Sequence, residues 1–298
     1  MQTADGAPGR LPTWLKVRLT TGPRFNAVRN RLRESGLHTV CEGADCPNRN
    51  ECWNAGTATA LILGDRCTRT CRFCNIAKGL PQKVDEGEPR RVAAALAALG
   101  LSYAVVTSVT RDDLPDGGAA QFAATIRAIR SVSPECRVEV LVPDLGGSGP
   151  ALDRVLEARP DVLNHNIETV PSLYRCVRPE ADYVRSISVL ARAAEKGVVT
   201  KSGIMVGLGE TLAEVRSVLA DLRKAGCAMV TIGQYLQPRK DLLPVARYYH
   251  PDEFAMLRQE GLAAGLREVM AGPLVRSSYR AASVVEGGLP RERTQERG

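Results

Sequence analysis

Six of the nine cysteines in this 298-residue chain lie between positions 41 and 74, in two groups of three. The groups have the spacings Cys41-x4-Cys46-x5-Cys52 and Cys67-x3-Cys71-x2-Cys74. Thiolates are soft ligands that suit iron–sulfur clusters, zinc or copper, and a [4Fe–4S] cube needs one ligand for each of its irons. Three cysteines per group therefore predict two cubes, each with one iron left open for chemistry or for a further ligand.

Other uses of these cysteines are possible. A structural zinc site could draw on Cys41, Cys46, Cys71 and Cys74, whose spacings fall in the range for zinc, but Cys52 and Cys67 would then have no role. An odd number of tightly clustered cysteines disfavours a secreted disulfide framework and favours metal binding in a reducing compartment. We expect the other three cysteines to be packing residues: Cys136, Cys176 and Cys227.

The N-terminus lacks the apolar region of a signal peptide, and no apolar run is long enough to cross a bilayer. We therefore expect a soluble, cytoplasmic protein with no membrane partner. The net charge is +7, and much of the excess lies before Glu34. These basic residues are Arg10, Lys16, Arg18, Arg24, Arg29, Arg31 and Arg33. They predict either a solvated helix or a docking surface for an acidic partner; with few aromatic residues and no recognised binding motif, nucleic acid is not expected.

Strand-like and helical patterns alternate from residue 57 onward. The predicted strands are Ala58–Leu63, Tyr103–Ser108, Arg137–Val142, Val162–Ile167, Val198–Val206 and Met229–Leu236. The predicted helices are Arg90–Leu99, Gly118–Val132, Ala151–Ala158, Asp182–Lys196, Thr211–Ala225 and Pro251–Glu268. Six β-α units predict an α/β fold, and because eight would be needed for a closed barrel, we expect a partial, open (β/α)6 TIM-type barrel.

Extensions flank this barrel. Residues 1–56 would form an N-terminal arm, with a helix over Phe25–Ser35 and an irregular loop that carries the first cysteine triplet. Residues 57–270 would form the barrel, and residues 271–298 a C-terminal extension that ends in a flexible tail. The second triplet follows the first strand directly, so it should lie at the active end of the barrel, where polar residues after later strands predict a shared pocket.

Cys67-Thr-Arg-Thr-Cys71-Arg-Phe-Cys74 resembles the cluster-binding motif of the radical S-adenosylmethionine (SAM) superfamily. The resemblance implies that Cys67, Cys71 and Cys74 hold a cube whose open iron chelates the amino and carboxylate groups of SAM. It further implies reductive cleavage of SAM to methionine and a 5′-deoxyadenosyl radical. The cofactor would then carry the difficult chemistry, and the protein would position it.

The first triplet narrows the resemblance. His38-Thr-Val-Cys41-Glu-Gly-Ala-Asp-Cys46-Pro-Asn-Arg-Asn-Glu-Cys52-Trp resembles the corresponding segment of lipoyl synthases. Further similar segments include Arg111-Asp-Asp-Leu-Pro-Asp-Gly-Gly118, Asn164-His-Asn-Ile-Glu-Thr-Val170, Gly233-Gln-Tyr-Leu-Gln-Pro238 and Gly272-Pro-Leu-Val-Arg-Ser-Ser-Tyr279. The match extends over about residues 11 to 283. It implies radical insertion of two sulfur atoms, at C6 and C8 of a protein-bound octanoyl-lysine, with an auxiliary cluster as the sulfur donor.

The resemblance also assigns residues. Cys41, Cys46, Cys52 and Ser278 would hold the auxiliary, sacrificial [4Fe–4S] cluster, with Ser277 as the alternative ligand; without the resemblance, Ser277-Ser278 would be predicted as a helix N-cap or turn. SAM would be contacted by Thr107, Ser108, Gly117, Gly118, Asn166, Glu168, Arg178, Lys201 and Gln234. A satisfied polar network in the barrel interior is the alternative for these residues. His165 is expected to be structural.

The resemblance implies partners as well. They are octanoylated lipoyl carrier domains, such as the acyltransferase subunit of 2-oxoacid dehydrogenases and the glycine-cleavage carrier protein, and an electron donor such as flavodoxin or ferredoxin. The chain departs from the family pattern at Gly43, at Arg239 to Asp241, and at Arg280, which affects expected peripheral contacts and leaves the cluster ligands in place. Two alternative functions remain open: another sulfur-inserting radical enzyme, such as one like biotin synthase or the methylthiotransferases, and a non-enzymatic iron–sulfur or zinc protein that binds nucleic acid.

Overall fold

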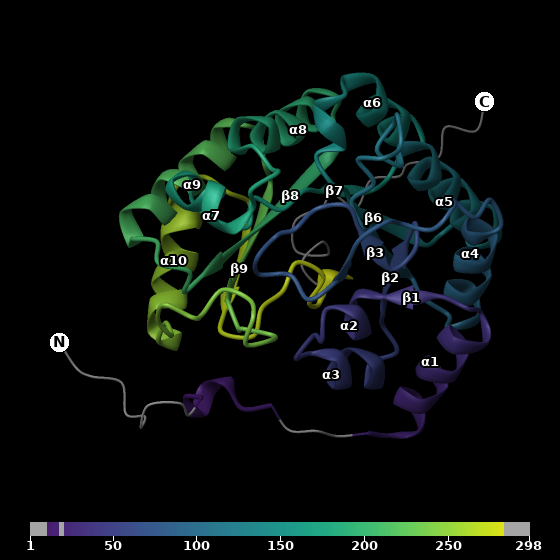
Figure 1. Cartoon of the computed structure of the whole chain (residues 1–298), viewed down its shortest axis with the longest axis horizontal. Helices are drawn as coiled ribbons and strands as arrows, with labels where there is room; N and C mark the ends of the chain where they lie inside the picture. The colour runs from purple at the N-terminus through teal and green to yellow at the C-terminus, as the bar shows by residue number, and fades with distance from the viewer. Residues whose placement is uncertain (1–10, 18–20, 283–298) are drawn as a thin grey trace.

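The computed structural model describes residues 11–17 and 21–282 of the chain (Figure 1). Its main sheet has eight strands in the order β1-β2-β5-β6-β7-β8-β9-β10. The strands are β1 (His38–Thr39), β2 (Thr59–Ile62), β5 (Tyr103–Ser108), β6 (Arg137–Leu141), β7 (Val162–Asn164), β8 (Val199–Val206), β9 (Met229–Gln234) and β10 (Glu268–Gly272). All neighbouring pairs are parallel except β1 with β2, which are antiparallel. Because β1 and β10 end the sheet without pairing, the barrel is open, as predicted.

Helices cover the outer face of this sheet (Figure 1). Those that follow the six predicted strands are α4 (Glu88–Ala98), α5 (Ala119–Val132), α6 (Gly149–Glu157), α8 (Tyr183–Glu195), α9 (Leu212–Lys224) and α10 (Pro251–Ala263). Their apolar residues recur at helical spacing, as in α9, where Val215, Val218, Leu219 and Leu222 are buried. Shorter helical segments are η2 (Leu145–Gly147), η3 (Pro171–Leu173) and α7 (Tyr174–Val177). The burial pattern fixes which face of each helix meets the sheet.

The last helix and strand differ from the prediction. The helix expected over Pro251–Glu268 ends at Ala263, and Gly265 adopts a left-handed conformation with a φ of +92°. Such a residue terminates a helix because L side chains avoid that conformation. The chain then forms β10, which pairs with β9 and adds a seventh parallel strand after the six predicted β-α units. The expected flexible tail, residues 283–298, lies outside the described residues.

The N-terminal part of the chain packs beside the open side of the barrel (Figure 1). It contains η1 (Thr13–Leu15), α1 (Pro23–Glu34), α2 (Val40–Gly43) and α3 (Arg49–Asn54). The irregular loop predicted for the first triplet is thus partly helical, because α2 and α3 flank Cys46. A small core holds these elements together, formed by Phe25, Val28, Leu32, Cys41, Trp53 and Ala58. Cys41 is part of this core, and Cys52 packs against it.

Alternate residues of the strands face the barrel interior. There Tyr103, Val105, Val162 and Met229 pack against Ala281 of the C-terminal segment. The segment that contains the predicted Ser277 and Ser278 therefore enters the barrel instead of lying on its surface. Among the described residues, no helix is long and apolar enough to cross a membrane.

Candidate active site

The second cysteine triplet lies in the loop that follows β2. Leu63, the residue after β2, has a φ of +68°, a strained conformation for a branched side chain. The carboxylate of Glu88 accepts the Leu63 backbone N–H at 2.9 and 3.1 Å, and Arg111 donates to the Leu63 carbonyl at 3.3 Å. Two buried side chains thus hold the turn at which the loop begins.

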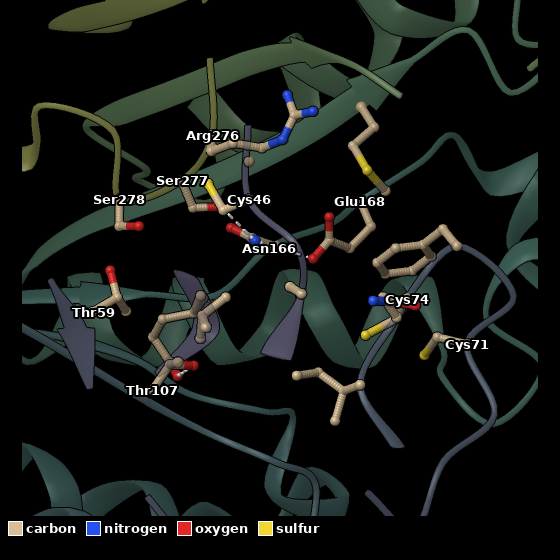
Figure 2. Close-up of a pocket in the computed structure, with 18 of the residues that line it drawn as sticks. Cys46, Thr59, Cys71, Cys74, Thr107, Asn166, Glu168, Arg276, Ser277 and Ser278 are labelled. Carbon is tan, nitrogen blue, oxygen red and sulfur yellow. Dashed lines mark hydrogen bonds between the residues drawn. The ribbon is translucent and has the colours of Figure 1, made fainter. Parts of the chain in front are cut away.

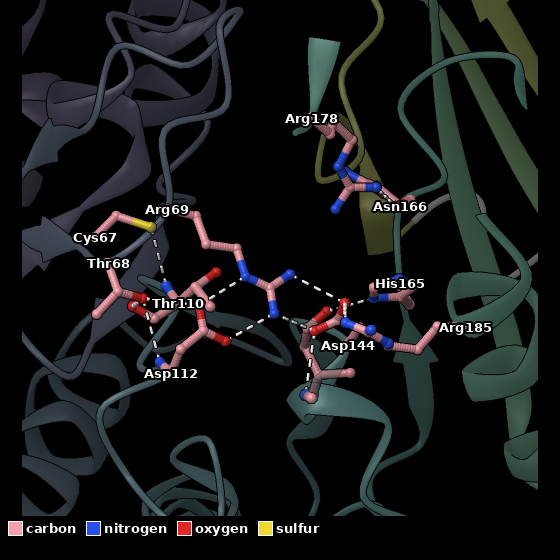
Figure 3. A network of polar contacts seen from close by, with 12 residues as sticks. Cys67, Thr68, Arg69, Thr110, Asp112, Asp144, His165, Asn166, Arg178 and Arg185 are labelled. Carbon is pink, nitrogen blue, oxygen red and sulfur yellow. Dashed lines mark hydrogen bonds and ion pairs between the residues drawn. The ribbon is translucent and has the colours of Figure 1, made fainter. Parts of the chain in front are cut away.

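Arg69, between Cys67 and Cys71, fixes the middle of this loop (Figure 3). Its guanidinium makes two bidentate ion pairs, with Asp112 after β5 at 2.7 and 2.8 Å and with Asp144 after β6 at 2.6 and 3.0 Å. Arg69 is 4% exposed, and the Asp144 side chain is fully buried. Bidentate pairing fixes direction as well as distance, so the loop is held to two neighbouring strand ends.

The thiols of this triplet share one environment. Burial is the main reason that the pKa of Cys71 is raised to about 11 and that the pKa of Cys74 is raised, and nearby thiols of the same triplet contribute to both shifts. Arg178 beside Cys71 and Lys78 beside Cys74 act in the opposite direction and lower the pKa values. Three close thiols with two cations nearby suit a thiolate-bound cluster, whose negative charge these cations would offset.

The first triplet forms a second set. Burial, together with the neighbouring Cys41 and Cys46, raises the pKa of Cys52 to about 12. Burial is also the main reason for the raised pKa of Cys46, while Arg276 and Arg49 lower that pKa. The six cysteines therefore interact as Cys41, Cys46 and Cys52 on one side and Cys67, Cys71 and Cys74 on the other. The alternative zinc site would need two thiols from each set, so this grouping speaks against it.

One cavity of about 490 Å³ lies at the C-terminal ends of the strands, and it is lined by Cys46 of the first set and by the whole second set. Figure 2 shows Cys46, Ser277 and Ser278 gathered on one side of it and Cys71 and Cys74 on the other. Cys67 also lines the cavity, and its thiol accepts the Thr110 backbone N–H at 3.4 Å. The volume is typical of a small-molecule site. Two thiol groups that meet across a shared cavity can place one bound molecule within reach of both.

The C-terminal segment closes the side of the cavity near the first triplet. Its backbone passes so close to β9 that a Cβ atom on Gly233 would lie 2.1 Å from the Val275 carbonyl oxygen. Asn166 donates from Nδ2 to the Ser277 hydroxyl at 2.6 Å. Among the described residues, none hydrogen-bonds to the Ser278 hydroxyl, which faces the cavity (Figure 2).

Comparison with known proteins accounts for this arrangement. The profile of the radical SAM superfamily matches residues 61–222, and that of the N-terminal domain of lipoyl synthase of the radical SAM family matches residues 1–46. A protein named lipoyl synthase from Rubrobacter xylanophilus is 54% identical over 94% of this chain and 88% of its own length. Another, from a Roseiflexus species, is 56% identical over 91% of both chains.

The chain belongs to the lipoyl synthase family.

Solved structures agree on the fold of this lipoyl synthase family member. A maturase of the [FeFe]-hydrogenase, HydG, superposes with a TM-score of 0.57 at 17% identity, over 78% of this chain and 55% of the other. Methylornithine synthase superposes with a TM-score of 0.52 at 14% identity, over 83% and 81%. Family membership confirms the predicted radical enzyme and its cofactors, SAM and two [4Fe–4S] clusters, over the two alternative functions.

Five of the predicted SAM contacts line the cavity: Thr107, Ser108, Asn166, Glu168 and Arg178. Three of them have buried polar atoms with no hydrogen-bond partner among the described residues, namely Ser108 Oγ, Asn166 Oδ1 and Arg178 Nε. Glu168 has a φ of +69°, and burial raises its pKa while Arg178 and Arg276 lower it. Strained backbone and unsatisfied buried donors and acceptors concentrate at ligand sites, so these residues fit a polar cofactor.

Two predicted contacts are buried away from the cavity. Lys201 is fully buried and pairs with Glu139 at 3.0 and 3.2 Å, and Glu139 also accepts from Tyr103 at 2.6 Å. Gln234 is fully buried and binds the backbone of Arg247 and Tyr249. The prediction placed both at strand ends. Both are instead committed to interior polar networks, which was the alternative stated for such residues.

Gly117 and Gly118 are also set back from the cavity. Both have positive φ, and Cβ atoms there would lie 3.1 Å from Leu145 Cα and 2.3 Å from Leu63 Cδ1 respectively. They permit the close approach of the turn before α5 to these two leucines, and their predicted contact with SAM is not supported. His165, by contrast, lines the cavity, and its Nδ1 lies 2.8 Å from the Val142 carbonyl oxygen. Burial is the main reason that the pKa of His165 is lowered to about 4, and the nearby Arg178 acts in the same direction, so the ring is neutral near pH 7.

Sequence reasoning overlooked Arg69 and Arg276. Arg69 lies inside the cysteine motif, and an arginine enclosed by three metal ligands could have been predicted to have a buried acidic partner. Arg276 lines the cavity, donates to the Val275 carbonyl at 2.7 Å and interacts electrostatically with Cys46 and Glu168. Arg276 is far from both of these residues in sequence, so the sequence alone does not predict these interactions.

The departures from the family pattern have structural explanations. A Cβ atom on Gly43 would lie 2.9 Å from Ile76 Cδ1, so a larger residue there would displace the end of the Ile76 side chain. Arg239 and Asp241 form an exposed ion pair at 2.9 Å. Arg280 pairs with Glu51 of α3 at 2.8 Å. None of the four departing residues, Gly43, Arg239, Asp241 and Arg280, lines the cavity.

Proposed function

We propose that the two thiol sets hold the two clusters in unequal roles. Cys67, Cys71 and Cys74 would bind the cube that activates SAM, and Cys41, Cys46, Cys52 and Ser278 would bind the auxiliary cube. The observation that supports this division is the placement of Cys46 and the second triplet on opposite sides of one cavity, with Asn166 and Glu168 between them (Figure 2). Bound there, these groups supply a carbon-centred radical and the sulfur.

Ser278 is preferred to Ser277 as the fourth auxiliary ligand. The Ser277 hydroxyl accepts the Asn166 amide at 2.6 Å, whereas the Ser278 hydroxyl faces the cavity. A serine oxygen is a harder ligand than thiolate and binds iron less well. A cluster with one such corner is suited to being taken apart.

The protein's own residues would bind, orient and shield. Glu168 is placed to accept from ribose hydroxyls, and Arg178 to donate to the cofactor carboxylate. The buried Arg69 pairs keep the radical-cluster loop rigid. The apolar part of the cavity wall, which includes Val40, Leu61, Leu141 and Leu236, would hold the octanoyl chain between the two sets and exclude water. No side-chain base is required, because the C6 and C8 carbons are unactivated and lose hydrogen atoms rather than protons.

The substrate would be an octanoyl-lysine on a lipoyl carrier domain, either of the 2-oxoacid dehydrogenase acyltransferase or of the glycine-cleavage system, in the cytoplasm. Flavodoxin or ferredoxin would supply electrons. The exposed basic residues of α1, among them Arg31 and Arg33, could dock an acidic carrier surface. Residues 1–56, 57–270 and 271–298 would then act as the auxiliary arm, the radical barrel and the C-terminal extension.

The experiment compares Cys46→Ala with Cys71→Ala after anaerobic reconstitution. Wild-type protein should contain about eight irons per chain, and each variant about four, by the count of one cube per triplet. With reductant, SAM and an octanoyl-lysyl peptide, Cys46→Ala should still form 5′-deoxyadenosine but no dithiolated product. Cys71→Ala should form neither. If Cys46→Ala lost 5′-deoxyadenosine and Cys71→Ala retained it, the two roles would have to be exchanged.

A further inference from the structure

The C-terminal segment that carries Ser278 is attached to the first cysteine triplet by protein contacts alone. Asn48, two residues after Cys46, donates from Nδ2 to the Leu274 carbonyl at 2.7 Å. The contact joins residues 226 positions apart, and Asn48 is only 4% exposed. It therefore fixes the segment four residues before Ser278 through a donor side chain that is largely shielded from water.

The same residue also contacts the triplet. The Asn48 carbonyl accepts the backbone N–H of Cys52 at 2.9 Å. Asn48 thus contacts one predicted cluster ligand through its backbone and holds the segment of another, Ser278, with its side chain.

A second attachment lies on the other side of Ser278. Glu51 of α3 accepts from the Tyr279 hydroxyl at 2.9 Å and from Arg280 at 2.8 Å. The side chains of Glu51 and Arg280 are exposed, so water and salt weaken this contact, and the part-buried Asn48 bond is the stronger constraint. Leu274 and Tyr279 bracket Ser278, and its position is therefore defined from both directions.

We propose that Asn48 is a positioning residue that holds Ser278 beside Cys41, Cys46 and Cys52 independently of iron. The proposal rests on the assignment of Ser278 as the auxiliary ligand. Serine is a poor partner for iron, so its bond alone cannot offset the entropy of ordering a whole segment. A ligand already fixed by the protein loses little freedom on binding. The site would also keep its shape after its cluster has been consumed.

The test measures iron, sulfide and the Mössbauer spectrum of full-length protein after anaerobic reconstitution. The variants are Asn48→Ala, Asn48→Asp, which keeps the shape but replaces the donor by an oxygen, and Ser278→Ala. Asn30→Ala, at an exposed position of α1, is the matched control. We expect both Asn48 variants and Ser278→Ala to fall from about eight irons towards about four, with the radical-cluster signal retained, and the control to stay at about eight.

Rescue separates positioning from a general effect on the fold. Ser278→Cys supplies a softer and stronger ligand, which should recover auxiliary iron in the Asn48→Ala background. Failure of rescue, or loss of both clusters in both Asn48 variants, would overturn the positioning role. Full loading of the Asn48 variants beside a depleted Ser278→Ala would overturn it too, and would leave Ser278 as a ligand. Full loading of Ser278→Ala would instead refute the ligand assignment, and with it this proposal.

Discussion

The ion pairs of Arg69 give the most quantitative prediction. Arg69→Met would leave the fully buried Asp144 with only the partly exposed Arg185, at 3.2 Å, as a cationic partner. Removing one member of a buried ion pair costs about 3–5 kcal/mol, because a charge is left without compensation. For a chain of this size, 1 kcal/mol corresponds to roughly 2–4 °C in melting temperature. We expect the metal-free variant to melt roughly 6–20 °C lower near pH 7 by these two ranges.

The pH dependence of folding stability gives a second, independent test of these ion pairs. The pairs with Arg69 outweigh burial and lower the Asp144 pKa from 3.8 to about 2. A lowered folded-state pKa contributes stability above the unfolded-state value, here about 2 kcal/mol, which is lost as pH falls from about 4 towards about 2. The variant should lack most of this contribution, so the difference between the two proteins should shrink over that range.

The assay is thermal unfolding of the metal-free chains, followed by circular dichroism at several pH values. Arg239→Met is the matched control, since Arg239 and Asp241 are 53% and 66% exposed and such a pair contributes at most about 1 kcal/mol. A decrease of less than about 2 °C for Arg69→Met, or a decrease equal to that of Arg239→Met, would refute the role given to the buried pairs.

Three further predictions concern other parts of the molecule. Lys201→Met should destabilise the metal-free chain by about 3–5 kcal/mol in denaturant titrations, because the buried Glu139 loses its cationic partner. The affinity of the folded variant for SAM should not change. A selective loss of SAM binding would return Lys201 to the cofactor site. Gly233→Ala should displace the Val275 carbonyl, lower the free energy of unfolding by about 1–3 kcal/mol and reduce the iron content of the auxiliary site. Full iron content would show that the C-terminal segment adapts to the added methyl group. The pKa values of Cys52 and Cys71 are raised to about 12 and about 11, so iron loading must release protons from these thiols. The rate of loading, measured by the growth of cluster absorbance, should therefore increase from about pH 7 to about pH 9. A rate independent of pH would contradict this.

Much of the fold could be predicted because the sequence periods are strong. The runs at 103–108 and 229–234 are fully or nearly fully buried strands, and the apolar positions of α9 recur at helical spacing. Strand β10 was missed because it is short, partly exposed and follows a helix closely. Only pairing with β9 makes it a strand, and that tertiary contact leaves no local signal.

The site likewise contains some residues that the sequence predicts and others that it does not. The cysteines are defined by their spacing within short segments, which a sequence displays directly. Lys201 and Gly118, which were predicted to contact SAM, lie away from the cavity. A strand-end position does not reveal whether a side chain points into the cavity or towards Glu139, or whether a glycine accommodates Leu63. The contact between Asn48 and Leu274 joins two remote segments, and only the folded chain brings them together.

The central claim is that the auxiliary set beside Ser278 supplies the sulfur and the set after β2 does not. It is tested most directly by reconstituting the protein with ³⁴S-sulfide, removing free sulfide and measuring the product of a single turnover by mass spectrometry. The account predicts two heavy sulfurs in the product, and iron loss confined to the Cys41, Cys46 and Cys52 site in the Mössbauer spectrum. Unlabelled product sulfur, or iron loss from the Cys67, Cys71 and Cys74 site, would contradict it.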